Sequence, residues 1–140
     1  MSSISPRLRR QLRAETVVLR CAYCHSPERL LGMPLEADHI RATAQGGKTA
    51  MANLCLACRT CNGHKWLVAK ARDPLTHRLV NLFHPRRQNW DEHFQWSADG
   101  THLLGLSATG RSTIEALQMN NDLIVNLRAL WVTLDLHPAE

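Results

Sequence analysis

The sequence has no long hydrophobic run, no internal repeat and no low-complexity segment. Among its 140 residues, no apolar stretch approaches the ~18–20 residues that a membrane-spanning helix needs, so we expect no membrane association. Residues 1–13 are basic but lack the apolar core of a secretory signal, so we expect a protein of the reducing cytoplasm. With 44% apolar and 21% charged residues, the chain is predicted to fold rather than to remain disordered.

Lysine and acidic residues are scarce, whereas arginine is abundant. Of the 17 basic residues 14 are arginines, and the formal net charge is +5. The planar guanidinium group matches phosphate oxygens, which makes an anionic polymer a candidate partner. Residues 1–20 are the most basic, and Ser5 followed by Pro6 predicts a helix start there. This helix is either a solvated surface element or an arm along nucleic-acid phosphates. The candidate phosphate contacts on it are Arg7, Arg9, Arg10 and Arg13.

Four of the five cysteines form two Cys-x-x-Cys pairs, a pattern that in a reducing compartment indicates metal binding before disulfide formation. Two such pairs fill the tetrahedral shell of zinc, so the ion is expected to be structural. Residues 25–57 separate the pairs, which exceeds the ~15–20 residues of common zinc ribbons and predicts a small subdomain between them. A redox dithiol or buried free thiols are the alternatives, and Cys55 is expected to be a buried small residue. The predicted zinc ligands are Cys21, Cys24, Cys58 and Cys61.

A second set of polar residues lies inside this cysteine clamp. Asp38 and His39 belong to a predicted strand over residues 35–40, and a loop with two adjacent glycines follows. Asn53 precedes a second apolar stretch, and Asn62 comes directly after the last cysteine, at the start of a helix predicted for residues 59–72. Taken singly, each of these residues has an ordinary structural role more often than a catalytic one.

Together, the Asp38-His39 pair, the double-glycine loop, Asn53 and the two cysteine pairs resemble the HNH endonucleases, over about residues 21–66. The resemblance implies a ββα-metal fold, in which two short antiparallel strands and a helix surround one divalent ion. It also implies that His39 is the general base and that Asp38 and Asn62 hold the catalytic ion. Asn53 would then fix the loop and orient His39.

This chemistry is reasonable on its own terms. A neutral imidazole can take a proton from water near neutral pH, and a divalent ion with oxygen ligands can stabilise the charge on phosphate. Asp and Asn donate oxygen, which suits Mg²⁺ or Mn²⁺. His64 is the alternative second ligand, but two positions on a helix differ by roughly 200°, so Asn62 and His64 cannot both face one ion. We expect Asn62 to be the ligand.

Basic residues flank the proposed site on both sides. They are candidate contacts to nucleic-acid phosphates, with a solvated charged surface as the alternative interpretation. These residues are Arg41, Arg59, Lys65 and Lys70.

The remainder of the chain is predicted to be an extension of the core. Residues 93–96 and 101–104 flank Asp99-Gly100, which predicts a β-hairpin. Ser112 to Glu115 forms a capping box that predicts one C-terminal helix. The fold class expected is α+β: a basic helix (1–20), a zinc-clamped ββα-metal core (21–72) and a hairpin with a helix (73–140), packed as one domain.

The function expected from these patterns is metal-dependent endonucleolytic cleavage of DNA. One site per chain favours nicking by a monomer, whereas double-strand cutting would need a homodimer or two events. Two alternatives stay open: a zinc-stabilised module that binds nucleic acid without cleaving it, and a zinc-stabilised adaptor for other proteins. Cleavage of DNA distinguishes the expected endonuclease from the binding module. An adaptor for other proteins is expected to show neither cleavage nor salt-dependent affinity for DNA.

Overall fold

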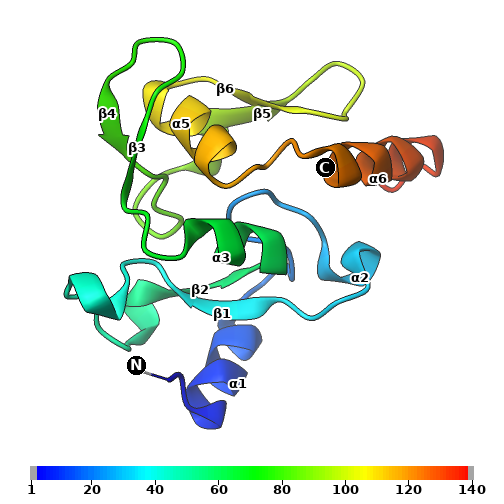
Figure 1. Cartoon of the computed structure of the whole chain (residues 1–140). Coiled ribbons are helices and arrows are strands. Elements are labelled where there is room, and N and C mark those ends of the chain that lie inside the picture. Colours follow the sequence, from blue (N-terminus) through cyan, green and yellow to red (C-terminus); the bar gives the residue numbers. More distant parts are fainter. Residues whose placement is uncertain (1–2, 139–140) are drawn as a thin grey trace. The chain divides into compact units, whose positions relative to one another are not determined.

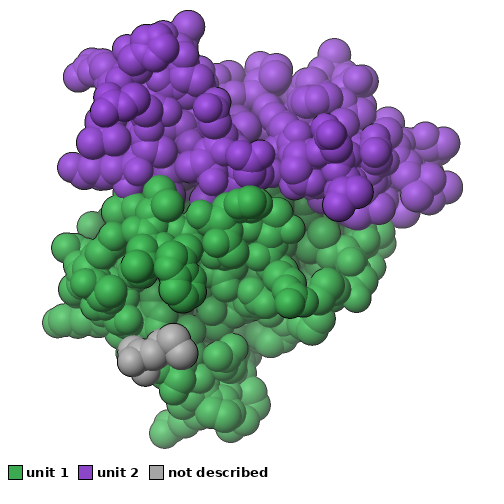
Figure 2. All heavy atoms as spheres, in the orientation of Figure 1, with its two compact units in different colours: residues 1–69, 84–88 green, residues 70–83, 89–140 purple. Residues whose placement is uncertain are grey.

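Short helices and pairs of antiparallel strands make up the structure, a computed structural model that describes residues 3–138 (Figure 1). The chain falls into two units: unit 1 comprises residues 1–69 and 84–88, and unit 2 comprises residues 70–83 and 89–140 (Figure 2). This mixture of helices and small antiparallel sheets confirms the expected α+β fold class. The packing as one domain stays a prediction. None of the helices within residues 3–138 has the length and apolar character needed to span a membrane.

Unit 1 is built on an antiparallel pair of strands followed by a helix. Strand β1 (Glu36–His39) pairs with β2 (Leu54–Ala57) in a register that places Asp38 opposite Cys55. Helix α3 (Arg59–Lys65) follows β2 and contacts β1, which gives the expected strand–strand–helix core. The other elements of this unit are α1 (Pro6–Glu15), α2 (Glu28–Leu31), and the 3-10 turns η1 (Thr43–Gln45) and η2 (Met51–Asn53).

The N-terminal helix begins where the sequence predicts. Ser5 Oγ accepts a hydrogen bond from Leu8 N at 3.2 Å, and Pro6 occupies the first helical position. Leu12 is the residue of α1 that is buried, and the helix contacts β2. The rest of α1 is largely exposed, so it is a basic surface helix attached through one apolar anchor.

Strand β2 forms the centre of unit 1, and all four of its residues are buried. Its continuous apolar sequence fits this position, because a strand covered on both faces needs no polar alternation. Leu54 and Leu56 pack there, and Tyr23 is also fully buried in this unit. From the segment 84–88, Arg86 donates Nε–H to the carbonyl oxygen of Leu54 at 2.7 Å, which satisfies an acceptor at the start of β2.

Within residues 70–83 and 89–138, unit 2 contains two further strand pairs and three helices. The hairpin predicted around Asp99-Gly100 is present, and Gly100 has a φ of 76°, a conformation that glycine adopts without strain. The buried side chains of unit 2 include Phe83, Phe94 and Trp131. The elements are β3 (Lys70–Arg72), β4 (Leu79–Asn81), α4 (Trp90–His93), β5 (Phe94–Trp96), β6 (Leu103–Gly105), α5 (Ala108–Ala116) and α6 (Asp122–Thr133).

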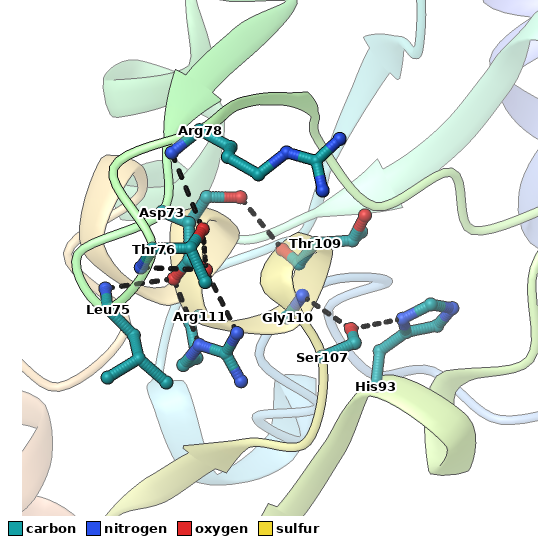
Figure 3. A network of polar contacts seen from close by, with 10 residues as sticks. Asp73, Leu75, Thr76, Arg78, His93, Ser107, Thr109, Gly110 and Arg111 are labelled. Carbon is teal, nitrogen blue, oxygen red and sulfur yellow. Dashed lines mark hydrogen bonds and ion pairs between the residues drawn. The ribbon is translucent and has the colours of Figure 1, made fainter.

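A buried carboxylate holds the connection between β3 and β4 against α5 (Figure 3). Asp73 accepts two hydrogen bonds from the guanidinium of Arg111, each 2.9 Å long, and one from Thr76 Oγ1 at 2.7 Å. The Arg111 guanidinium and these hydrogen bonds hold the pKa of the Asp73 carboxyl well below its usual range. This network has no counterpart in the sequence prediction.

The predicted helix over residues 59–72 is wrong beyond Lys65. Trp66 has a φ of 33° and a ψ of −111°, so the backbone leaves the helical conformation there. Lys70–Arg72 then pairs with Leu79–Asn81 as a strand. Strand pairing across the short connection at residues 73–78 overrides the local helical preference at these positions.

The single C-terminal helix is also a wrong prediction. The segment forms two helices, and the first begins earlier than the capping box indicates, with Ser107 as its N-cap. Gln118 has a φ of 53°, which interrupts the helical path. Asn121 then caps the second helix, and its side-chain oxygen accepts a hydrogen bond from Ile124 N at 3.0 Å.

Candidate metal centre and active site

The four cysteines of the two Cys-x-x-Cys pairs converge in unit 1 and form a four-cysteine cluster. Their sulfur atoms all lie within 4.8 Å of one another, and the sulfurs of Cys24 and Cys58 are 3.8 Å apart. Four sulfur ligands at ~2.3 Å from a zinc ion are about 3.8 Å from each other in a tetrahedron, so the spacing fits zinc. All four cysteines are buried and reduced. The closed shell of thiols therefore fits a structural ion.

Each half of this four-cysteine cluster is held by the backbone of the core. In the first half, Ala22 N donates to Leu56 O on β2 at 2.8 Å. In the second half, Cys58 is the N-cap of α3, and its sulfur accepts a hydrogen bond from Cys61 N at 3.4 Å. A metal ion bound here would join the segment before β1 to the start of α3, and so would lock the strand pair between them.

The electrostatics of the four-cysteine cluster also favour a cation. Burial raises the pKa of the Cys21 thiol well above its ordinary value. Hydrogen bonds from the neighbouring cysteines, Cys21 first among them, hold the pKa of Cys24 well below its ordinary value. A metal ion bound here would stabilise the buried sulfurs as thiolates.

Asn53 fixes the loop that follows β1. Its side-chain oxygen accepts from Arg41 N at 2.9 Å, and its Nδ2 donates to Arg41 O at 3.0 Å and to Lys48 O at 2.8 Å. The backbone oxygen of Asn53 also accepts from Ile40 N at 2.8 Å. Asn53 therefore holds both ends of the loop, and these contacts give the loop-fixing role predicted for it a geometric basis.

The two glycines of this loop are required by its geometry. Gly46 has a φ of 89°, in the left-handed region that glycine favours. At Gly47, a Cβ atom would collide with the carbonyl oxygen of Arg41 and would lie 2.9 Å from Nδ2 of Asn53. The double glycine of the motif thus allows the close backbone approach that the Asn53 hydrogen bonds need.

His39 is the last residue of β1 and is partly exposed. Its Nε2 lies 2.8 Å from Oγ1 of Thr49, which belongs to the loop that Asn53 holds. Asn53 therefore reaches His39 through this loop rather than by direct contact of the two side chains. The arrangement places a partly exposed imidazole, oriented by a hydroxyl, at the end of the strand pair where the loop between β1 and β2 begins.

Asp38 has the opposite environment, because its side chain is buried between β1, α3 and the first cysteine pair. Its Oδ2 lies 3.3 Å from Lys65 Nζ and accepts a hydrogen bond from the Tyr23 hydroxyl at 3.3 Å. Burial raises the pKa of the Asp38 carboxyl, and the Lys65 ammonium opposes this rise. A carboxylate in this position has a strong preference for a nearby cation.

Asn62 lies on α3, one helical turn before Lys65, and its side chain contacts β1. Its Nδ2 donates to Oε1 of Glu36 at 3.0 Å. Glu36 and Asp38 are two positions apart on a strand and so share a face, while Asn62 and Lys65 are three apart on a helix and share a face. These two faces meet through the Asn62–Glu36 hydrogen bond and the Lys65–Asp38 ion pair, so two carboxylates and one side-chain amide lie at one interface. Such a donor set fits a hard divalent cation such as Mg²⁺ or Mn²⁺.

The basic residues predicted to contact phosphate have different environments. Arg41 and Arg59 are exposed, and so are the side chains on α1, although Arg13 forms a two-pronged ion pair with Glu28 at 2.8 Å. Lys70 is exposed but begins the first strand of unit 2. Lys65 is 3% exposed and its ammonium is engaged inside unit 1, which is at odds with the phosphate contact expected of it.

Sequence reasoning missed three residues that shape the site. Tyr23, Glu36 and Thr49 contact Asp38, Asn62 and His39, respectively. Glu36 has a signal in the sequence, because strand alternation puts it on the face of Asp38. Tyr23 lies in the turn between Cys21 and Cys24, and Thr49 lies in the loop after β1. The directions of side chains in such segments follow no periodic pattern in the sequence. His64 is exposed on α3.

The segment that contains these residues was compared with known protein families and proteins. The family model of the HNH endonuclease matches residues 21–66, about a third of the chain. The match spans both cysteine pairs, β1, β2 and α3. No curated protein and no solved structure was found to be similar to the chain. An HNH domain supports a nuclease or nucleic-acid-binding role in general.

The four-cysteine cluster leads to a prediction about folding. Cys58→Ser is expected to lose the bound zinc and to unfold unit 1, because a structural zinc site contributes on the order of 10 kcal/mol to folding. Metal analysis of the purified protein and a thermal melt followed by circular dichroism measure both effects. Cys55→Ala is the matched control, since Cys55 is buried outside the cluster and its loss should leave one zinc per chain. A Cys58→Ser protein that melts like the parent would contradict the structural role.

Proposed function

We propose, on the premise that residues 21–66 form an HNH endonuclease domain, that this protein is a divalent-metal-dependent endonuclease that hydrolyses phosphodiester bonds in DNA. The observation that carries the proposal is the pairing of a partly exposed imidazole with a partly buried interface of carboxylate and amide side chains inside one cysteine clamp. Hydrolysis of a phosphodiester needs both a group that accepts a proton from water and a centre that stabilises negative charge.

His39 is the proposed general base. A neutral imidazole carries one N–H and one lone pair; when Nε2–H is donated to Thr49 Oγ1, the lone pair is on Nδ1. This nitrogen can then accept a proton from the attacking water. Asn53 contributes by holding the loop that carries Thr49, so it is a positioning residue.

Asp38 and Asn62 are the proposed ligands of the catalytic ion. When bound, a divalent ion supplies Lewis-acid stabilisation of the charge that develops on the phosphate and the leaving oxygen. Glu36 orients the amide of Asn62 through the 3.0 Å hydrogen bond, and Tyr23 does the same for the carboxylate of Asp38 at 3.3 Å. These contacts keep both donors at the interface of β1 and α3.

DNA is the proposed substrate because the exposed basic residues of unit 1 are mostly arginines. Arg41 and Arg59 flank the site, and Arg7 and Arg10 lie exposed on α1. Guanidinium groups bind phosphate oxygens without reading the base sequence. We therefore expect the affinity for DNA to fall as salt rises and to depend little on the base sequence. A module that binds DNA without cutting it would show the same affinity, which makes cleavage the deciding observation.

Removal of the general base is expected to abolish cleavage and leave binding intact. With Mg²⁺ or Mn²⁺ present, His39→Ala should nick supercoiled plasmid about 10²- to 10⁴-fold more slowly than the parent, with zinc content and DNA affinity nearly unchanged. His64→Ala is the matched control, since that exposed histidine lies on α3 and should leave the rate unchanged. Full activity of His39→Ala would rule out His39 as the general base.

A metal titration distinguishes the two candidate ligands on α3. Asn62→Ala is expected to lose activity or to require far more Mg²⁺, because it removes an oxygen donor that Glu36 holds at the interface. His64→Ala should keep the Mg²⁺ dependence of the parent, because His64 is exposed on α3 and is not one of the proposed ligands. Plasmid nicking over a range of Mg²⁺ concentrations gives both curves. The reverse pattern would mean that His64 holds the ion.

A further inference from the structure

Lys65 differs from the other lysines because its charge is buried beside the carboxylate proposed to bind the ion. The residue is 3% exposed, its Nζ lies 3.3 Å from Asp38 Oδ2, and it donates a hydrogen bond to His39 O at 2.7 Å. A buried ammonium is retained only where partners compensate for the loss of hydration. Here the compensating partners are the proposed metal ligand and the backbone of the proposed general base.

The same carboxylate cannot serve two cations equally well. In the structure, the Lys65 ammonium neutralises Asp38 in a buried position where unpaired charge is costly. A divalent ion held by Asp38 would lie close to that ammonium, and like charges at short range in a poorly hydrated site repel strongly. Binding of the ion and retention of the present Lys65 contact therefore oppose each other.

We propose that Lys65 is a displaceable internal counter-ion, which pairs with Asp38 when the divalent ion is absent and leaves that carboxylate when the ion binds. This inference rests on the proposed function, because it takes Asp38 as a ligand of the catalytic ion. The exchange lowers the affinity of the site for the ion, since each binding event must break the Lys65 contacts. In return, the metal-free core avoids an unpaired buried carboxylate.

The position of Lys65 makes this exchange feasible. It is the last residue of α3, and the residues that follow, Trp66 and Leu67, are exposed. Rotation about the bonds of its own long side chain can therefore take the ammonium toward solvent without moving β1. No other lysine of unit 1 is buried within the described residues, because Lys48 is exposed.

Chemical labelling of the wild-type chain tests the exchange directly. The zinc-loaded protein is acetylated with an amine-reactive ester, without divalent ion and over a Mg²⁺ titration, and each of its three lysines is followed by peptide mass spectrometry. Without Mg²⁺, Lys65 should react more slowly than Lys48 and Lys70, because its amine is buried. With Mg²⁺, labelling of Lys65 should rise several-fold while that of the other two stays constant.

Binding measurements on variants provide a second test. Lys65→Gln removes the charge but keeps a hydrogen-bond donor, and it should bind Mn²⁺ at least about tenfold more tightly than the parent, the size of effect that one nearby charge has on proton affinity. Lys65→Arg keeps the charge and should gain nothing. Lys48→Gln is the control for loss of an exposed charge. Free Mn²⁺ measured by electron paramagnetic resonance gives the affinities without any need for cleavage.

The outcomes separate this inference from the function on which it rests. If the parent binds Mn²⁺ and Asp38→Asn does not, but Lys65→Gln binds it more weakly or Lys65 stays protected from acetylation in Mg²⁺, the counter-ion role is wrong and the metal site stands. If neither the parent nor Lys65→Gln binds Mn²⁺ beyond its zinc, the proposed metal site itself is wrong. If Lys65→Gln does not fold, the labelling of the wild-type chain alone decides.

Discussion

The convergence of four cysteine sulfurs on one point is the constraint on which the rest of unit 1 depends. The first pair precedes β1 and the second pair opens α3, so a zinc ion bound to both closes a loop around the strand pair. Every proposed catalytic residue lies within that loop or directly after it. With strands of four residues and a helix of seven, local hydrogen bonds alone would not hold these residues in place.

The candidate site has a buried part around Asp38 and a partly exposed part around His39. Asp38 is enclosed by Tyr23, Lys65 and its own strand partner, which suits a ligand that must hold a cation against water. His39 is the next residue, and strand alternation turns it to the other face, where Thr49 and the glycine-rich loop leave it partly exposed. The proposed metal ligand and the proposed general base are thus adjacent residues of one short strand with different environments.

The parts that the sequence predicts are those that local spacing determines. The Cys-x-x-Cys pairs, the double glycine and the Ser5-Pro6 helix start each impose a local geometry, and the structure has all three. The burial of Lys65 could not be predicted, because it depends on which face of α3 meets β1. The strand at residues 70–72 was missed because its pairing with residues 79–81 outweighs the helical preference of its own residues. The break at Gln118 was missed because its left-handed backbone has no signal in the local sequence.

The measurement that tests the proposed metal-dependent cleavage most directly is plasmid nicking by the wild-type protein at fixed zinc content. Loosely held divalent ions are removed first, and zinc is determined before and after each assay. We predict one zinc per chain throughout, no nicking without added ion, and a saturable rise in nicking with added Mg²⁺ or Mn²⁺. Nicking that needs no added ion, or DNA binding without cleavage at any concentration of either ion, would contradict this mechanism.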